Sequence, residues 1–558
     1  MRDLCVHEVF ERQRTVTPSA PAAWHGERAV TYDEVGLAAR RVAMRLRERG
    51  VTPGSLVGLC TTRSPQALAA ILGTLEAGAA FVALDPETRL DDALRPDVVV
   101  SDQSTRRRAE AYGLPCVCLP LGQDGEEGGA AANGGSPESA TCVLLGRDAG
   151  DDRTGIVLDH RQIVSAAHEA VAALEIDRAC IVLSTAGLDD PRLLLEMLVS
   201  WSIGGALRLV DNLLFVGRMP EPGATTVLFA DPHAVEDLLE HSVPLRGLSR
   251  LVLTGDIIGP DLVRQLEGLG VTRTLCSVGH PAASGWIAGG SIEPGRENVF
   301  AAARDGRGGL RVLGPDLREL PPEVGGDVYA EGPTVARRYW RAERLEGPLT
   351  TDAAGTRLLR TGFVGRKERD GGVRLEGRKT RRHWLEGRYV YAEAIEALLL
   401  RVPGIGSATV AVDDNGLRIR LAPARGASPA EAERAARRML AEGPTGKLPI
   451  GSVTVLASGG LDRSSSAPRT ESPPAGTATE RALARVWRTL LANPDLELSR
   501  NFFDAGANSL MAALACSQLS DELGVVLTIV DAYNHPTITE LARAIDGRLQ
   551  SSNNGGAP

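Results

Sequence analysis

Apolar, strand-like runs alternate with amphipathic helical stretches over roughly the first 360 residues of the chain. The runs SLVGLCT, AFVAL, CIVLST and RLVLTG are separated by segments such as YDEVGLAARRVAMRLRERG, which has helical periodicity and ends at Gly50. Strands that alternate with helices in this way are typical of layered α/β folds. The alternation therefore predicts an α/β architecture for the larger part of the chain.

A Ser/Pro-rich segment, SSSAPRTESPPAGT at residues 464–477, has the composition of a flexible linker. Beyond it, ATERALARVWRTLLA, NSLMAALACSQLSDELG and TITELARAIDGRLQ carry apolar residues at helical spacing. These stretches predict a small helical bundle at the end of the sequence. A chain of 558 residues with 43% hydrophobic content can form two or three domains with cores of their own.

The patterns of charge, hydropathy and cysteine spacing argue against nucleic acid, membrane and metal as partners of this chain. The net charge of -9 is spread along the chain and leaves no basic patch, so we expect no nucleic acid partner. No window holds 18 consecutive apolar residues, and the start MRDLCVHEVFERQ lacks a secretory pattern, so we expect a cytoplasmic protein without a membrane partner. Only Cys116 and Cys118 of the eight cysteines lie close together, in a spacing that fits no common zinc site. We therefore expect reduced cysteines and no metal site.

Lysine is scarce, which limits any chemistry that needs it. The 62 basic residues include only three lysines, Lys367, Lys379 and Lys447. Codon bias explains this composition in general terms. Even so, a catalytic lysine has only three positions at which it can lie.

Ser509 stands after a run of small residues and directly before an apolar run of helical period, in AGANSLMAALACSQL. One interpretation is an N-cap, in which Asn508 or Ser509 satisfies free backbone N–H groups. A second follows from the surroundings, because FFDAGANSL with DAYNHPTITELA resembles the carrier domain of nonribosomal peptide synthetases. The resemblance implies that Ser509 carries a 4'-phosphopantetheine arm. The start of a helix favours the negative charge of its phosphodiester.

The preceding region is similar to the adenylation domain of the same synthetases. AVTYDEVGLAARRVAMRLRERGV, LGTLEAGAAFVALDPE and LRELPPEVGGDVYAEGPTVARRYWRAERL match three of its motifs. The resemblance implies an α/β adenylate-forming fold with a large N-terminal portion, a small α+β C-terminal portion and a following all-α four-helix carrier bundle. It also implies an aminoacyl-AMP made from an amino acid and ATP with Mg²⁺, then passed to the carrier thiol.

The phosphate-binding motif of that family is altered in this chain. Where the family has a Gly/Ser/Thr-rich loop that ends in P-K-G, residues 145–155 read LGRDAGDDRTG, with Thr154 at the lysine. A phosphate cradle needs N–H groups, hydroxyls and a cation, whereas this loop brings three aspartates. Arg147 and Arg153 could offset part of that charge. We interpret the loop as an ordinary polar turn.

Other motif positions of this chain also lack the functional residue that the family has there. The acid that helps to hold Mg²⁺ is replaced by Ala282, the aspartate for the ribose hydroxyls by Phe363, and the hinge aspartate by Thr380. Gly460, in SGGLDR, stands at the catalytic lysine, and Lys447 is the nearest alternative. A displaced cation rarely recovers transition-state geometry, so we expect no catalytic residue at these positions.

The aspartate that grips the substrate ammonium in the family falls near AGLDDPRLLLEML. An alignment without gaps that is anchored on Glu196 places Pro191 at the position of this aspartate. Shifting the alignment by one or two residues places Asp190 or Asp189 at that position. Either acid could instead cap a helix that begins at Pro191, which is the interpretation we prefer.

These features predict an adenylation-carrier didomain that tethers an aminoacyl group, with an inactive adenylation domain loaded in trans. An active, self-loading ligase that uses ATP and Mg²⁺ is one alternative, and a pure scaffold is another. The implied partners are a phosphopantetheinyl transferase, a trans-acting adenylation or aminoacyl-transfer enzyme, downstream condensation or tailoring enzymes and, as a further candidate, an MbtH-like helper. We expect an N-terminal adenylation-like subdomain at residues 1–377 and a C-terminal one at residues 378–463. A linker at residues 464–476, a carrier domain at residues 477–549 and a disordered tail at residues 550–558 should follow.

Overall fold

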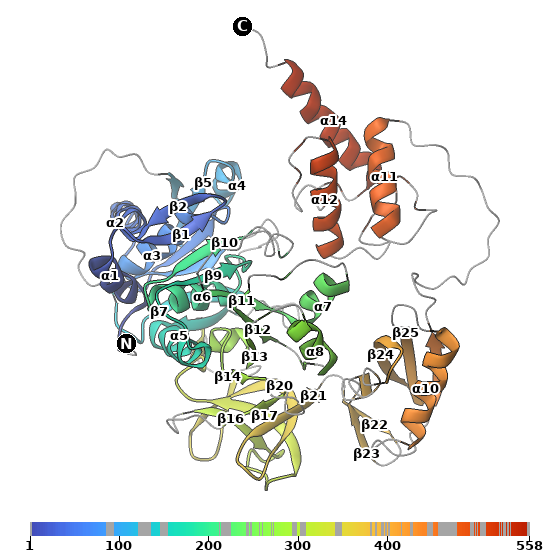
Figure 1. The fold of residues 1–558 in the computed structure, drawn as a ribbon. Helices are drawn as coiled ribbons and strands as arrows, with labels where there is room; N and C mark the ends of the chain where they lie inside the picture. The colour runs from blue at the N-terminus through green and yellow to red at the C-terminus, as the bar shows by residue number, and fades with distance from the viewer. Residues whose placement is uncertain are drawn as a thin grey trace. The chain divides into compact units, whose positions relative to one another are not determined.

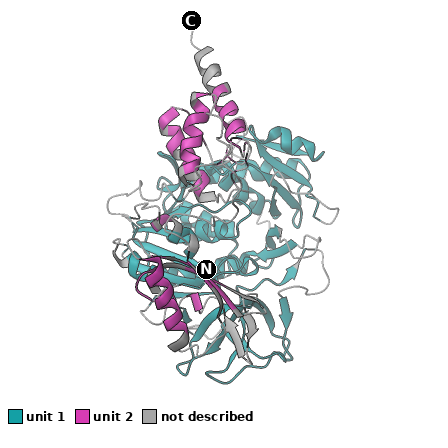
Figure 2. Cartoon of the chain, turned by 90° about the vertical axis from the view of Figure 1, so that its right-hand side faces the viewer, with its two compact units in different colours: residues 1–236, 244–382 teal, residues 237–243, 383–558 magenta. Residues whose placement is uncertain are grey.

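The chain forms two compact units in the computed structural model, coloured separately in Figure 2. The first comprises Met1–Glu236 and Pro244–Arg382, and the second comprises Asp237–Val243 and His383–Pro558. The domain boundaries expected from the sequence stay predictions. The structure describes residues 3–84, 94–120, 135–145, 155–210, 213, 225–240, 245, 248–255, 257–258, 260–268, 271, 273–292, 298–301, 308–340, 349–379, 382–385, 388–391, 395–396, 399, 402–413, 416–423, 428–442, 450–455, 477–490, 496, 498, 500, 502, 509–523, 525, 527, 532, 535 and 537–554.

An eight-stranded sheet lies at the centre of the first unit, in the order β14-β13-β12-β11-β9-β10-β1-β2 (Figure 1). Neighbours from β13 to β1 are parallel, and β14 and β2 add antiparallel edges. Parallel strands place their carboxyl ends along one edge, where α/β folds bind ligands. The strands are β1 Pro21–His25, β2 Arg28–Thr31, β9 Cys180–Ser184, β10 Ala206–Leu209, β11 Thr225–Ala230, β12 Arg250–Thr254, β13 Arg273–Val278 and β14 Ala288–Ser291.

A second sheet of seven strands has the order β18-β8-β7-β4-β3-β5-β6. The strands from β7 to β6 are parallel neighbours, whereas β8 and β18 pair in antiparallel fashion. Its strands are β3 Leu56–Cys60, β4 Ala80–Ala83, β5 Val98–Asp102, β6 Cys116–Leu119, β7 Ala140–Leu145, β8 Gly155–Asp159 and β18 Arg338–Tyr339.

Helices cover these sheets, and local sequence sets their ends. Thr31 accepts the backbone N–H of Glu34 and so caps α2, while Gly50 follows its end with a φ of +85°. Helix α3 packs closely on α2, because a Cβ at Gly73 would lie 2.3 Å from the backbone oxygen of Ala39. The helices of the first unit are α1 Val6–Val16, α2 Tyr32–Glu48, α3 Pro65–Glu76, α4 Arg106–Ala111, α5 His160–Leu174, α6 Arg192–Trp201 and α8 Pro260–Gly268, with a 3-10 turn η2 at Pro281–Ala283. Helix α7, Pro232–Glu240, is divided between the two units after Glu236.

A third sheet of the first unit is antiparallel, in the order β15-β21-β20-β17-β16, with β19 paired to β20. Val328, Leu358 and Val364 are fully buried in it. The strands are β15 Val299–Phe300, β16 Gly309–Leu313, β17 Gly325–Glu331, β19 Leu349–Thr351, β20 Arg357–Lys367 and β21 Val373–Arg378.

The second unit contains a small α+β part and a helical part. Strands β24 and β25 are antiparallel, β25 and β26 are parallel, and α10 contributes Ala432, Ala436 and Leu440 to the same core. These elements are β22 Arg382–Leu385, β23 Arg388–Tyr391, β24 Ile405–Asp413, β25 Gly416–Pro423, β26 Ile450–Val455 and α10 Pro429–Glu442.

The helical part contains α11 Ala478–Leu490, α12 Ser509–Leu523 and α14 Ile538–Asn554. Their inward faces share one apolar core, in which the rings of Trp487 and Phe502 stack with centroids 3.8 Å apart. The family resemblance implies a four-helix bundle, and these three helices are the ones that lie among the described residues. Within the described ranges, no helix is both long enough and apolar enough to cross a bilayer.

Candidate functional site

Phe363 lies in β20, at the position where the family resemblance places an aspartate for the ribose hydroxyls. Its side chain is 3% exposed, and the residue pairs with Arg378 of β21. The guanidinium carbon of Arg378 lies 4.3 Å from the Phe363 ring centroid. Arg378 also donates a hydrogen bond to the backbone oxygen of Gly255, just after β12. This position therefore offers a packed cation–π pair instead of a carboxylate acceptor.

Ala282 lies in the turn η2, at the position of the acid expected to help hold Mg²⁺. It is fully buried, and its N–H donates to Nδ1 of His280 at 3.0 Å. Burial lowers the pKa of His280 to about 4, and the charge of Arg378 acts in the same direction. Gly279, just before this turn, has no room for a side chain, because a Cβ there would lie 2.6 Å from the backbone oxygen of Gly285. The turn is thus preserved, while the side chain at the metal position has no oxygen ligand.

Asp190 stands at the start of α6 and is engaged within that helix. One carboxylate oxygen accepts the backbone N–H of Arg192 at 2.9 Å, and the other accepts two guanidinium hydrogen bonds at 2.8 and 2.6 Å. Pro191 occupies the N-cap position, one residue before the helix begins. Asp189 is exposed. The contacts of Asp190 are those of a helix-start residue, and a role in gripping a substrate amine stays a prediction for both acids.

Glu196, which anchors the alignment of this segment, is 1% exposed in α6. Burial raises its pKa to about 8, so the protonated form predominates at neutral pH. A neutral carboxyl attracts an ammonium much less than a carboxylate does. Neither Glu196, in the middle of α6, nor the arginine-paired Asp190, before its first turn, thus supplies a free negative charge.

Two of the three lysines are described, and both pair with acids of the antiparallel sheet region. The ammonium of Lys367 lies 2.7 Å from Glu319, and that of Lys379 lies 2.5 Å from Asp327. The third, Lys447, lies outside the described residues, as do Thr380, Gly460 and residues 146–154 of the altered loop. Their predicted roles stay predictions.

Ser509 is the first residue of α12, as expected from the sequence. The structure describes its backbone but not its side chain. Ala512, Ala515, Cys516 and Leu519 of this helix are buried at a spacing of three and four residues. Because these residues fix one face of α12 in the core, the start of the helix is held on a stable element. A serine at a helix N-terminus fits a phosphodiester, since the free backbone N–H groups and the helix dipole both favour an anion.

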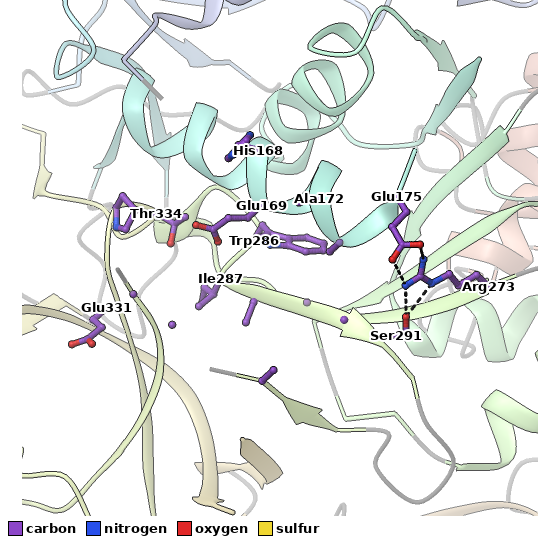
Figure 3. A pocket seen from close by; sticks show the side chains of 18 residues that line it. His168, Glu169, Ala172, Glu175, Arg273, Trp286, Ile287, Ser291, Glu331 and Thr334 are labelled. Atoms are coloured by element: carbon purple, nitrogen blue, oxygen red, sulfur yellow. Dashed lines mark hydrogen bonds and ion pairs between the residues drawn. The ribbon is translucent and has the colours of Figure 1, made fainter. Parts of the chain in front are cut away.

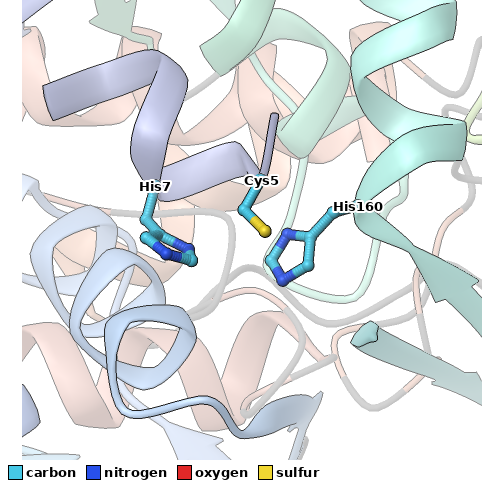
Figure 4. Close-up of side chains that lie close together, drawn as sticks. All are labelled: Cys5, His7 and His160. Atoms are coloured by element: carbon cyan, nitrogen blue, oxygen red, sulfur yellow. The ribbon is translucent and has the colours of Figure 1, made fainter. Parts of the chain in front are cut away.

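Cys5, His7 and His160 are the one group of three potential metal ligands found among the described residues, with ligand atoms within 4.8 Å of one another (Figure 4). His160 accepts the N–H of Val6 at Nδ1, at 3.1 Å, so its neutral ring carries the proton on Nε2. Neither nitrogen then presents a lone pair to a metal ion. Burial raises the pKa of the Cys5 thiol to about 12. We interpret the cluster as the anchor of α1, and the absence of a metal site stays a prediction.

Two site features escaped the sequence analysis. Arg378 lies two residues before Thr380, but only the pairing of β20 with β21 shows that it covers Phe363. Arg63, just after β3, donates to the backbone oxygens of Ser184 and Ala186 and so joins the two parallel sheets. Neither arginine carries a local pattern that would predict its distant partner.

The two parallel sheets, the antiparallel sheet and the small α+β part define an adenylate-forming fold, followed by a helical carrier segment. Residues 10–95 match the family model described as AMP-binding enzyme, and residues 481–545 match that described as Phosphopantetheine attachment site. The chain therefore has the fold of adenylate-forming enzymes, matches AMP-binding enzymes and a phosphopantetheine attachment site over these residues, and has nonribosomal peptide synthetases among its relatives. The predicted fold class and the 4'-phosphopantetheine cofactor are confirmed at this level.

Three similar proteins illustrate the relationship. A linear gramicidin synthase polypeptide of Brevibacillus parabrevis is 26% identical over 98% of this chain, which spans only 7% of that relative's length. Novobiocin biosynthesis protein H of Streptomyces niveus is 27% identical over 96% of this chain and 95% of its own. The crystal structure of holo-AB3403, a four-domain nonribosomal peptide synthetase bound to AMP and glycine, superposes with a TM-score of 0.66 at 20% identity, over 98% of this chain and 43% of that one.

Proposed function

We propose that this chain is an adenylation-carrier didomain whose carrier tethers an aminoacyl thioester on Ser509 and whose adenylation region does not make the adenylate. The observation that carries the proposal is the buried Phe363 ring under Arg378, 4.3 Å away, at the ribose position. A carboxylate that accepted two hydroxyl hydrogen bonds would contribute roughly 1.5–3 kcal/mol for each bond to a charged group. The aromatic ring can make neither bond.

Independent positions support the same conclusion. Ala282 has no oxygen ligand for Mg²⁺, the carboxylate of Asp190 is occupied by Arg192, and Gly460 stands at the catalytic lysine. The changes to Ala282 and Gly460 each remove a group that the family uses to stabilise the transition state of adenylation, so their effects accumulate. An aminoacyl group must then come from another enzyme that loads the arm in trans.

The adenylation region nevertheless keeps a folded core. Trp201, Trp286 and Tyr329 are almost fully buried in it, and Gly279 preserves its turn. A folded but inert region can hold the carrier near the loading enzyme, which would raise the effective concentration of the two. The partners we propose are a phosphopantetheinyl transferase, the loading enzyme, downstream condensation or tailoring enzymes and an MbtH-like helper, all in the cytoplasm.

Calorimetric titration of the full chain with ATP and Mg²⁺, together with an ATP-pyrophosphate exchange assay over the proteinogenic amino acids, tests the proposal. We expect no exchange above a protein-free control with any of them. Robust exchange with one amino acid would instead favour the active ligase. A chain that cannot receive the phosphopantetheine arm would favour the pure scaffold.

A further inference from the structure

Cys116 and Cys118 lie on strand β6 and are the two cysteines of this chain that are partly exposed. All eight cysteines lie among the described residues and are free, and the other six are buried. Strand β6 has β5 as its one partner among the described strands, so it is the edge of the seven-stranded sheet. Successive residues of a strand point to opposite faces, and the buried Val117 separates the two cysteines. Both thiols therefore lie on the same face of β6.

The register of β5 and β6 shows that the Cys116 sulfur leans towards Cys118. Ser101 of β5 is paired with Cys118, yet its hydroxyl contacts Cys116, with Oγ and Sγ 3.2 Å apart. The Cys116 side chain thus extends along the strand in the direction of Cys118. The Cys118 thiol donates a long hydrogen bond of 3.7 Å to the backbone oxygen of Leu119. Because a thiol is a weak donor, a ligand between the two sulfurs can replace this bond at little cost.

The spacing of the two cysteines disfavours a disulfide and suits a bridging ion. Residues two apart on a strand are separated by roughly 6.6 Å, and their Cβ atoms point the same way. A disulfide needs its Cβ atoms about 3.8 Å apart, so its formation would require the backbone to move. An ion that binds two thiolates in a line, at about 2.3 Å each as for zinc, holds the sulfurs roughly 4.6 Å apart. Side chains that lean along the strand can reach this separation.

We propose that Cys116 and Cys118 bind a soft metal ion that accepts two thiolate ligands, namely Cu(I). Thiolates are soft ligands that select Cu(I) over harder metals. The spacing that fits no common zinc site, which takes four ligands, does not exclude an ion that takes two. Binding forms two sulfur–copper bonds, breaks two S–H bonds and releases two protons, and the copper remains Cu(I). The site is independent of the proposed role of Ser509.

Positive groups lie near the edge strand, where the bis-thiolate complex would carry a single negative charge. Arg106 of α4 is paired with Glu110 at 2.9 Å. The hydrogen bond and the charge of Glu110 raise the pKa of Arg106, and the charges of Cys118 and Cys116 act in the same direction to a smaller extent. Arg49 donates a hydrogen bond of 3.0 Å to the backbone oxygen of Cys116. Both guanidinium groups favour the charged complex over the empty dithiol.

The buried cluster of Cys5, His7 and His160 is the alternative place for a soft ion. Its ligand atoms lie within 4.8 Å of one another. Burial raises the pKa of the Cys5 thiol to about 12 and so opposes the thiolate that a metal ion needs. The partly exposed pair on β6 offers two thiols, whereas this cluster offers one. We therefore expect the ion at Cys116 and Cys118.

The cavity in the first unit offers no competing thiol. It has a volume of about 340 Å³ and lies between the second half of α5, the residues that follow β17 and strand β14, beside Gly290 (Figure 3). Among the described residues, its lining contains no cysteine, and Glu175 on its wall is paired with Arg273 at 2.7 Å. A soft ion therefore gains less there than between two thiolates.

Anaerobic titration with Cu(I), in competition with the chromophoric chelator bicinchoninate, tests the assignment. The full chain is used in its Ser509→Ala form, so that no arm thiol binds the ion. We expect one Cu(I) per chain and two protons released for each ion bound, measured with a pH indicator in weak buffer. Zn(II), which takes four ligands, should bind at least about 100-fold more weakly. Failure of the chain to withdraw Cu(I) from the chelator, or equal affinity for Zn(II), would overturn the proposal.

Two further variants, made in the same chain, locate the site. Cys116→Ser and Cys118→Ser each leave one thiol of the pair and should each weaken Cu(I) binding about 100-fold. Cys5→Ser is the matched control, because Cys5 is the N-cap of α1 and serine is favoured there, and it should bind Cu(I) without loss. Thermal unfolding verifies that each variant is folded. Undiminished binding in both Cys116→Ser and Cys118→Ser, or a comparable loss in Cys5→Ser, would contradict the location.

Discussion

Phe363 and Arg378 face each other across β20 and β21, with the guanidinium carbon 4.3 Å from the ring centroid. The aromatic ring is held from two sides, by burial in the sheet and by the arginine that is itself bonded to Gly255. Phe363, which stands where the family has the aspartate for the ribose hydroxyls, is thus part of the buried core of this sheet.

Phe363→Ala should therefore destabilise the first unit. A buried phenylalanine truncated to alanine loses about 3–5 kcal/mol, which includes the cavity left behind. Urea denaturation would measure the change in the free energy of unfolding. The control is Val324→Ala, whose side chain is 45% exposed and which should change the free energy by less than about 0.5 kcal/mol. Similar losses in the two variants would show that the ring does not support the core.

Ser509→Ala should abolish attachment of the phosphopantetheine arm, because the hydroxyl is the nucleophile that forms the phosphodiester. Intact mass after treatment with coenzyme A and a phosphopantetheinyl transferase would reveal one arm on the wild type and none on the variant. Ser520→Ala is a matched control on the same helix, where the native hydroxyl donates to the oxygen of Cys516 at 2.7 Å. A Ser509→Ala chain that still gains the arm would refute the assignment.

The sequence predicts the local structure of this protein well. The four apolar runs coincide with β3, β4, β9 and β12, and the helix expected to end at Gly50 ends at Glu48, because a capped helix and a buried strand leave local patterns. The helix start at Ser509 was predictable for the same reason.

Long-range relationships were not predictable in this way. The contact of Phe363 with Arg378 depends on strand register, and the hydrogen bond from Val6 to His160 joins residues 154 positions apart. The cavity beside Gly290 likewise needs α5, β14 and the residues after β17 to meet. Such features depend on tertiary packing, which residue patterns along one chain do not encode locally.

His160 should make the stability of the first unit depend on pH. Burial lowers its pKa from 6.5 to about 3 in the folded chain, with a smaller effect from His7. The unfolded chain therefore binds more protons between these values. The contribution of neutral His160 to the free energy of unfolding is complete above about pH 6.5 and is lost as the pH falls towards 3. Over this range the free energy of unfolding changes by at most about 1.4 kcal/mol per pH unit.

His160→Asn tests this dependence, because an amide oxygen can accept the Val6 N–H in place of Nδ1 but does not titrate. The free energy of unfolding, measured from pH 4 to pH 7, should vary less in the variant than in the wild type. Parallel curves for the two proteins would mean that other groups set the acid sensitivity.

Acylation of the holo chain by itself tests the central claim most directly. The full chain, with its arm attached at Ser509, is incubated with ATP, Mg²⁺ and the proteinogenic amino acids, and intact mass is recorded before and after thioester cleavage. Because Ala282 and Phe363 cannot supply the metal and ribose contacts, we predict no aminoacyl mass increment without a second, loading enzyme. An aminoacyl thioester on Ser509 formed by the chain alone would contradict the account and identify it as a self-loading ligase.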